Sequence, residues 1–337
     1  MKNKVLKICN AMIHPGEIAS LALPMPEIFN CTPMYMPIKV VHGKQAGPCV
    51  LVIAAVHGDE LNGMEIVNRL LSLSMMKNLH GTLIAIPVFN VYGFITRSRY
   101  LADGLELDRY FPGSETGSHA SRLAHLFTKE ILSMADYCID IRTGAINHSN
   151  FPKIYIDTTN ERTKELAEAF RAPVICNVSA EKNSLRETAN FNKIPYMVYE
   201  AGEALRFDEH AIKIGVRGVA NVLRKLKMLP EAHKQQKKAA KPFFTVQYLW
   251  VRASKSGVSY SKTKLGQWVK KGEQLTVIKD PVGTTEPSAV CAPCDGIIVD
   301  KNNLPVVHEG ESLFQIAIFH EMEKAADHFE DWHATSI

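Results

Sequence analysis

The chain of 337 residues is long enough for two domains, or for one large domain with an appendage. Its composition, 46% hydrophobic and 22% charged, is typical of a folded globular protein, and its net charge of +4 is too small to indicate nucleic-acid binding. The densest basic stretch, residues 224–241, is better explained as a solvated helix end with a linker than as a phosphate-binding patch. No apolar run approaches the ~18 residues of a membrane helix, so we expect neither a nucleic acid nor a membrane as partner.

The cysteines and the N-terminal segment bear on the compartment. There are seven cysteines, an odd number, and several lie inside apolar runs, as reduced cysteines often do. Cys291 and Cys294 form a single Cys-x-x-Cys pair, which favours ordinary thiols over a structural zinc site. The first 17 residues lack the apolar core and cleavage-like site of a signal peptide. We therefore expect a cytoplasmic protein.

The first 230 residues alternate predicted strands with predicted helices. Short strands punctuated by proline are expected within residues 1–45, and an apolar strand that is buried on both faces follows. The predicted strands after residue 45 are 49–56, 82–89, 137–141, 154–156, 173–178 and 195–199, and the predicted helices are 64–71, 118–134, 161–170 and 209–229. This alternation predicts an α/β fold with a mostly parallel or mixed sheet and helices on both faces.

Three predicted strands end in polar side chains. His57 and Glu60 follow the first strand, Arg142 ends the strand that starts at Tyr137, and Glu200 ends the strand that starts at Pro195. In such sheets, ligands bind beyond the carboxyl ends of the strands. The irregular segment 90–113 is rich in Arg, Asp and Gly, and loops of this length inside compact domains tend to be functional.

The sequence pattern changes after residue 242, where helical periodicity almost disappears. Residues 243–319 contain short β-like runs and many Gly turns, and predict a small all-β domain. This part resembles the biotinyl/lipoyl-type barrel-sandwich hybrid in three segments, 265–275, 292–298 and 307–316. The lysine flanked by methionines that carries the cofactor in such domains is missing, so no attachment is expected. The predicted boundaries are 1–235 for the α/β domain, 236–242 for a linker, 243–320 for the β domain and 321–337 for a tail.

The pair His57 and Glu60 is a candidate metal corner. Imidazole and carboxylate suit Zn²⁺, which in catalytic sites takes three protein ligands and leaves a position for water. A His-x-x-Glu pair is common by chance, and a buried histidine near a helix start is the alternative explanation. The context favours the metal, because the pair directly follows an apolar strand and precedes a helical pattern.

Four motifs stand in the order seen in the succinylglutamate desuccinylase/aspartoacylase family, which the chain resembles over about residues 45–230. The motifs are HGDELNG (57–63), LELDRYFPG (105–113), DIRTG (140–144) and YEAG (199–202). The resemblance implies a zinc carboxypeptidase-like fold, and the C-terminal β domain also fits the family's arrangement. It further implies a hydrolase in which a zinc-activated water deacylates an N-acyl amino acid or a related small amide.

The resemblance also implies roles for individual residues. His57 and Glu60 match the first two zinc ligands, and Glu200 matches the general base. Arg109 matches the arginine that holds the substrate carboxylate or polarises its carbonyl. Arg97 is a further candidate for anchoring an anionic group, although a loop-bracing role is equally open.

The chain departs from the family pattern at two positions, both placed in the predicted substrate-binding set with Arg97. Arg142 stands where the third zinc ligand, a histidine, is usual, and a guanidinium cannot bind a metal because it stays protonated. Asp108 replaces the asparagine before the motif arginine. His148 is the predicted replacement ligand. In one alternative, Asp140 or a water completes a weaker metal site. In another, the metal site has decayed.

The departure at Arg142 supports an alternative function. A catalytically silent member of the family would bind a small acidic metabolite or a partner without turnover. The motifs name neither the acyl group nor the amine, and they leave open whether the chain forms a homo-oligomer.

Overall fold

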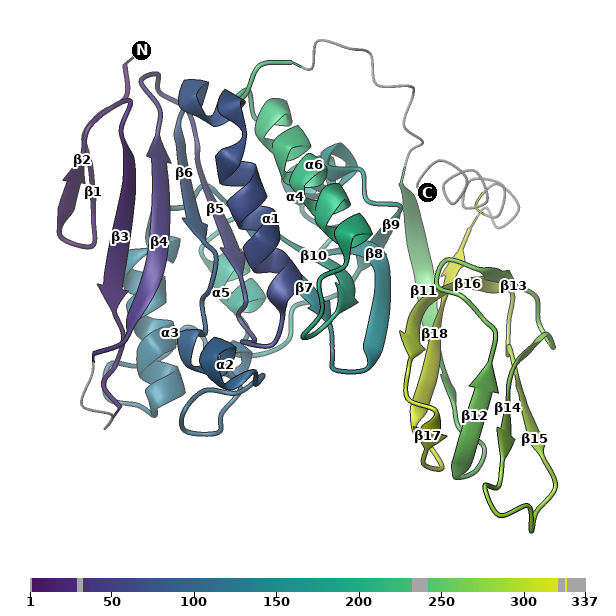
Figure 1. The fold of residues 1–337 in the computed structure, drawn as a ribbon. Helices are drawn as coiled ribbons and strands as arrows, with labels where there is room; N and C mark the ends of the chain where they lie inside the picture. Colours follow the sequence, from purple (N-terminus) through teal and green to yellow (C-terminus); the bar gives the residue numbers. More distant parts are fainter. Residues whose placement is uncertain (1, 29–32, 232–241, 321–324, 326–337) are drawn as a thin grey trace.

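The computed structural model describes residues 2–28, 33–231, 242–320 and 325 (Figure 1). Nearly all of the predicted linker, 236–242, and of the predicted tail, 321–337, lies outside these residues. None of the described helices is both long enough and apolar enough to cross a membrane.

A mixed sheet of twelve strands forms the centre of the molecule, in the order β13-β16-β18-β11-β9-β8-β10-β7-β5-β6-β4-β3. Neighbours β6, β5, β7 and β10 run parallel, whereas β8 is antiparallel to β10 and β4 to β6. The strands before residue 204 are β1 (Leu6–Ile8), β2 (Ala11–Ile13), β3 (Ile18–Pro24), β4 (Tyr35–His42), β5 (Cys49–Ala54), β6 (Thr82–Ile86), β7 (Tyr137–Gly144), β8 (His148–Ile156), β9 (Val174–Asn177) and β10 (Tyr196–Glu203). The predicted mixed α/β sheet is confirmed.

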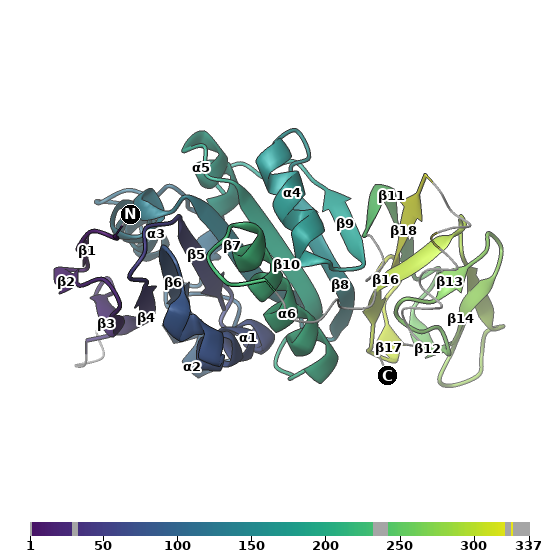
Figure 2. The ribbon, with the colours of Figure 1, turned by 90° about the horizontal axis from the view of Figure 1, so that it is seen from above.

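Helices cover both faces of this sheet (Figures 1 and 2). One apolar core joins the sheet to α1, α4 and α6, and a second joins the opposite face to α3 and α5. The helices are α1 (Leu61–Ser72), η1 (Ser74–Asn78), α2 (Val91–Thr96), η2 (Leu107–Arg109), α3 (His119–Glu130), η3 (Leu132–Met134), α4 (Glu161–Phe170), α5 (Leu185–Phe191) and α6 (Glu209–Lys225).

Local sequence explains where several helices begin. The side chains of Asn90, Ser118, Asn160, Ser184 and Asp208 each accept a hydrogen bond from a backbone N–H of the first helical turn. Such caps satisfy donors that would otherwise lack a partner at a helix start. Glu60 occupies the same position before α1 but makes no such bond, because its carboxylate is turned toward His57.

The C-terminal part is all-β, as predicted, and two sheets enclose its apolar core. Four of its strands extend the large sheet, and the other four form the separate sheet β15-β14-β12-β17. The strands are β11 (Phe243–Arg252), β12 (Gly257–Ser261), β13 (Trp268–Val269), β14 (Gln274–Lys279), β15 (Ser288–Cys291), β16 (Gly296–Asn302), β17 (Val306–Val307) and β18 (Ser312–Phe319).

This β unit is continuous with the α/β unit rather than tethered beside it. β11 pairs parallel with β9, and β16 pairs antiparallel with the start of β8. At that junction His148 Nδ1 lies 2.8 Å from Asp300 Oδ1, and the Asn303 amide donates to Glu203 Oε2 at 2.8 Å. The C-terminal unit therefore braces β8, the strand whose side chains, as shown below, orient Glu200.

The junction predicts a pH-dependent stability. The hydrogen bond to Asp300 raises the pKa of His148; partial burial opposes this, and the charges of Asp300, Glu311 and Glu203 add to it. A raised folded-state pKa stabilises the fold below the unfolded value of about 6.5, and this contribution is lost as the pH rises through the folded value. The Asp300→Asn variant should therefore be less stable than the unmodified protein mainly at low pH.

The measurement is the free energy of unfolding from denaturant titrations at pH values on both sides of about 6.5. The difference between the two proteins should shrink as the pH rises. A difference that stays constant over this range would show that the His148–Asp300 ion pair contributes nothing.

Candidate functional site

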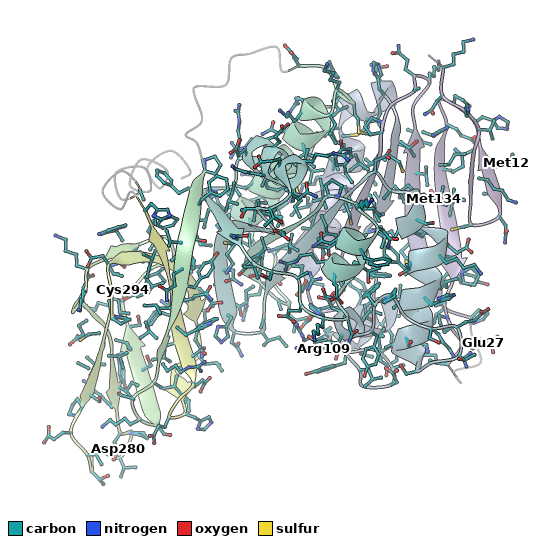
Figure 3. All side chains as sticks on the ribbon, turned by 180° about the vertical axis from the view of Figure 1, so that it is seen from behind. Met12, Glu27, Arg109, Met134, Asp280 and Cys294 are labelled. Carbon is teal, nitrogen blue, oxygen red and sulfur yellow. The ribbon has the colours of Figure 1, made fainter. Side chains whose placement is uncertain are left out.

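The candidate site lies at the carboxyl ends of β5, β7 and β10. The segment between α2 and α3, which contains η2, and the start of α5 close over these strand ends. Arg109, labelled in Figure 3, belongs to this region of the α/β unit, whereas Asp280 and Cys294 mark opposite ends of the C-terminal unit. The parallel strand ends thus meet at one edge of the sheet, as expected for ligand sites in α/β folds.

His57 and Glu60 form a buried pair in the turn after β5. Their side chains are 2% and 3% exposed, and His57 Nδ1 lies 2.8 Å from Glu60 Oε1. Within the described residues His57 Nε2 and Glu60 Oε2 are buried without a hydrogen-bond partner. Burial raises the pKa of Glu60, and the nearby charges of His57, Arg142 and Arg99 offset this only in part.

Glu106 connects this pair to two arginines. Its Oε1 lies 3.5 Å from His57 Nε2 and accepts a hydrogen bond from Arg99, and its Oε2 accepts one from Arg109 Nε at 2.6 Å. Burial alone would raise the pKa of Glu106, but these bonds and the charges of Arg99 and His57 outweigh it and lower the pKa. Glu106 is therefore a carboxylate that is held ionised among cations.

Arg142 is fixed by two carboxylates. Its Nη1 donates to Asp108 Oδ2 at 2.7 Å, while Nε and Nη2 lie 2.7 and 2.6 Å from Asp140 Oδ2. Tyr196 donates its hydroxyl to the same Asp140 oxygen, and the Leu185 amide donates to Asp108 Oδ1 at 3.3 Å. The guanidinium thereby joins β7, β10, η2 and α5.

The charges in this cluster stabilise one another. Burial opposes the charged forms, yet Asp108 and Asp140 raise the pKa of Arg142 well above its usual value. In return, the charge and hydrogen bond of Arg142 hold the pKa of Asp108 below its usual value despite burial. Arg142 is a permanent cation in the site.

Glu200 stands beside Arg142, because the two are register partners on β10 and β7. Its Oε1 accepts hydrogen bonds from Asn150 at 3.0 Å and Tyr155 at 3.3 Å, and the buried Lys153 ammonium lies 3.3 Å away. All three partners belong to β8. The carboxylate is 20% exposed, so it is oriented by the protein and reachable by water.

A cavity of about 160 Å³ opens beside these groups. Four guanidinium groups and three carboxylates line it, which leaves one positive charge in excess. The lining residues are Arg99, Glu106, Asp108, Arg109, Arg142, Glu181, Ser184, Arg186, Tyr196 and Val198. Its size suits a small molecule, since pockets for drug-sized ligands are typically ~300–1,000 Å³.

The structure brings most of the predicted residues to this site. Arg109, Asp108 and Arg142 line the cavity, and Glu200 adjoins Arg142. Arg97 instead lies exposed at the end of α2, in a left-handed conformation with φ 55°, and is not part of the lining. The arginine of that segment that lines the cavity is Arg99, two residues further on.

His148 is not brought to His57 and Glu60. It lies at the start of β8, and its Nδ1 faces Asp300 of the C-terminal unit. The sequence prediction missed this because the partner strand, β16, lies more than 140 residues further along the chain.

The predicted zinc ion can be tested against the donor set. His57 Nε2 and Glu60 Oε2, buried and unpartnered, are ligand-type atoms, but a catalytic zinc site takes three protein ligands. Glu60 faces Nδ1 of His57, and Glu106 faces Nε2 on the other side of the ring. One ion therefore cannot bind His57 together with both carboxylates. Within the described residues, no group of three or more His, Cys, Asp or Glu side chains is arranged to hold a metal. These residues do not fit a three-ligand zinc site, and the zinc ion stays a prediction.

Several site residues were not among those predicted. Glu106 lies inside the LELDRYFPG motif and Arg99 inside the Arg-rich segment 90–113, so both stood in stretches already singled out. Arg186 lies on α5, a helix that was not predicted, and no local pattern marks it. Its Nη1 donates to the Val178 carbonyl, and its Nε is buried and has no partner among the described residues.

Comparison with known proteins supplies independent information. The family model described as the succinylglutamate desuccinylase/aspartoacylase catalytic domain matches residues 46–226. A curated relative from Halomonas elongata, N-alpha-acetyl-L-2,4-diaminobutyric acid deacetylase, is 24% identical over 294 residues, which cover 84% of this chain and 85% of the relative.

Two solved structures share the fold. A succinylglutamate desuccinylase/aspartoacylase from Rhodobacter sphaeroides superposes with a TM-score of 0.81 at 24% identity, over 90% of this chain and 96% of that one. The product-bound ectoine utilization protein EutE (DoeB) from Ruegeria pomeroyi superposes with a TM-score of 0.78 at 21% identity, over 89% and 95%. At these identities the likeness shows the fold alone.

The buried ion pairs of Arg142 predict a large stability effect. Asp140 is fully buried, so Asp140→Asn leaves the guanidinium short of a charged partner and should lower the free energy of unfolding by about 3–5 kcal/mol. The control is Glu165→Gln, which removes an exposed ion pair with Lys225 and should cost at most about 1 kcal/mol. Denaturant titrations measure the free energy of unfolding of both variants. Equal losses of stability would contradict the prediction that the buried ion pair of Asp140 matters more than an exposed one.

Proposed function

We propose, on the premise that this chain belongs to the succinylglutamate desuccinylase/aspartoacylase family, that it hydrolyses a small N-acylated amino acid to a carboxylic acid and the free amine. The match of the family model to residues 46–226 confirms the family that the four ordered motifs predicted. The curated relative is named as a deacetylase of an N-acetylated diamino acid, which supports an amide of this kind as the substrate.

The arginine-lined cavity is the observation that carries the proposal. N-acyl amino acids bear at least one carboxylate, and guanidinium groups bind carboxylates through paired hydrogen bonds. Arg109 lines the cavity with a side chain that is 65% exposed, so a ligand entering from solvent can reach it. The excess positive charge of the lining favours an anionic ligand over a neutral one.

Glu200 is the proposed general base. Its carboxylate must accept a proton from the attacking water, and a fixed base next to the reacting carbonyl is what such catalysis requires. The bonds from Asn150 and Tyr155 orient Oε1. The proton then passes to the leaving nitrogen as the C–N bond breaks.

The cations beside Glu200 are suited to the developing oxyanion. Attack of water moves negative charge onto the carbonyl oxygen, and preorganised donors stabilise that charge. Arg142 lies next to Glu200 across the β7–β10 pair, and Arg109 lines the same cavity. No step of this proposal depends on zinc, whose binding stays a prediction that metal analysis of the purified protein tests.

A second candidate function is ligand binding without turnover. The observation that favours it is Arg142, because a site that lacks a third metal ligand also lacks a metal-activated water. Both candidates use the same cavity. They differ only in whether bound N-acyl amino acid is released unchanged or as two products.

Glu200→Gln tests the first candidate. If the chain is a deacylase, this variant should lose at least about 100-fold in kcat for its best substrate, since a general base contributes about 10²–10⁴-fold. The matched control is Glu209→Gln on the exposed start of α6, which should keep full activity.

The assay follows free amine release from a panel of N-acetyl and N-succinyl amino acids. A Glu200→Gln variant that is as active as the unmodified protein would refute the role of Glu200. Binding of a panel member with no product from the unmodified protein would favour the second candidate.

A further inference from the structure

Arg142 stands in the sequence where the family resemblance implies the third metal ligand beside His57 and Glu60. It lies near the end of β7, next to Glu200 on β10, and its charge acts on Glu60. In the described part of the chain Arg142 makes no hydrogen bond to His57 or Glu60, and His57 Nδ1 faces Glu60 Oε1 at 2.8 Å. Arg142 therefore does not fill the space between His57 and Glu60 and cannot be a metal ligand, but it places a positive charge beside Glu60.

The arginine is held so firmly that it cannot make room for an ion. Three of its N–H groups point to Asp108 and Asp140, and the Arg142 side chain is 13% exposed. Moving it away would leave Asp140, which is 0% exposed, as a buried carboxylate without a cation. A divalent ion added next to it would also face the repulsion of a fixed positive charge.

Within the described residues Asp108 and Asp140 take up three of the five N–H groups of Arg142, which leaves two for a ligand or water in the cavity that Arg142 lines. Arg186, which lines the same cavity, adds a buried Nε with no partner in the described part of the chain. A buried donor without a partner, such as the Arg186 Nε, is rare and indicates a ligand or water that satisfies it. These donors suit an anionic or carbonyl oxygen.

We infer that Arg142, fixed between Asp108 and Asp140, is the resident cation of this site, and that the site binds its ligand without a divalent metal. The class of ligand rests on the proposed function, and the role of Arg142 adds to that function the group that binds the ligand. The guanidinium supplies the positive charge toward the ligand oxygen that a metal ion supplies in sites with three ligands. This disagrees with the zinc ion that the family resemblance implied.

The first arm of the test measures zinc directly. The full-length protein is incubated with excess Zn²⁺, passed through a desalting column and analysed for metal by emission spectroscopy. The unmodified protein should retain clearly less than one ion per chain. Arg142→His, which offers an imidazole in place of the guanidinium, should gain zinc relative to it, because His57 and Glu60 then have a third partner. Stoichiometric zinc on the unmodified protein overturns the inference.

The second arm measures ligand binding by calorimetry, with N-acetyl-L-glutamate and N-succinyl-L-glutamate as probes. The dissociation constant should be the same in EDTA and in Zn²⁺. Arg142→Gln should weaken binding about tenfold or more, because a charge-assisted hydrogen bond is lost, and Arg142→Lys should recover part of the loss by keeping the charge. The control is Arg69→Gln, which removes an arginine that also bonds two carboxylates but lies outside the cavity.

The outcomes separate this inference from the proposed function. Binding that requires Zn²⁺ overturns the inference and leaves the proposed substrate class standing. If neither probe binds under any condition, the proposed substrate class is weakened, and the zinc arm alone decides the role of Arg142. Because the unmodified protein is measured in both arms, a variant that fails to fold does not remove the test.

Discussion

The buried ion pairs of Arg142 are the constraint on which the site depends. A guanidinium taken out of water is stable only when carboxylates surround it with good geometry. Asp140 comes from the same strand, whereas Asp108 comes from η2, 34 residues earlier. Satisfying one buried charge therefore fixes the loop of segment 90–113 onto the end of β7, and the bond from Leu185 to Asp108 brings the start of α5 to the same place.

The other polar groups of the site are arranged around that cation. His57 is placed between two carboxylates, Glu60 on one nitrogen and Glu106 on the other, and Glu106 in turn holds Arg99 and Arg109 at the mouth of the cavity. Glu200 is oriented from the opposite side by β8. Because β8 is braced by β16 of the C-terminal unit, that unit supports the orientation of the proposed base from outside the cavity.

The sequence was sufficient to predict features that depend on neighbouring residues. The apolar run before His57 predicted a buried strand, β5. The motif order predicted the family, and the alternation of strands with helices predicted the mixed α/β fold. The strand expected at 82–89 ends at Ile86, where the chain turns at Pro87 toward α2. The features that were missed depend on contacts between distant residues. His148 meets Asp300 152 residues away, and Arg99, which was not predicted, lines the cavity and donates to Glu106.

The most direct test of the account is a crystal structure of the protein grown with Zn²⁺ and an N-acyl amino acid, with anomalous data collected at the zinc edge. We predict that no anomalous peak lies between His57 and Glu60 and that Arg142 still binds Asp108 and Asp140. A ligand oxygen should lie within hydrogen-bond distance of the Arg142 guanidinium. A zinc peak at that corner, with Arg142 displaced from its two carboxylates, would contradict it.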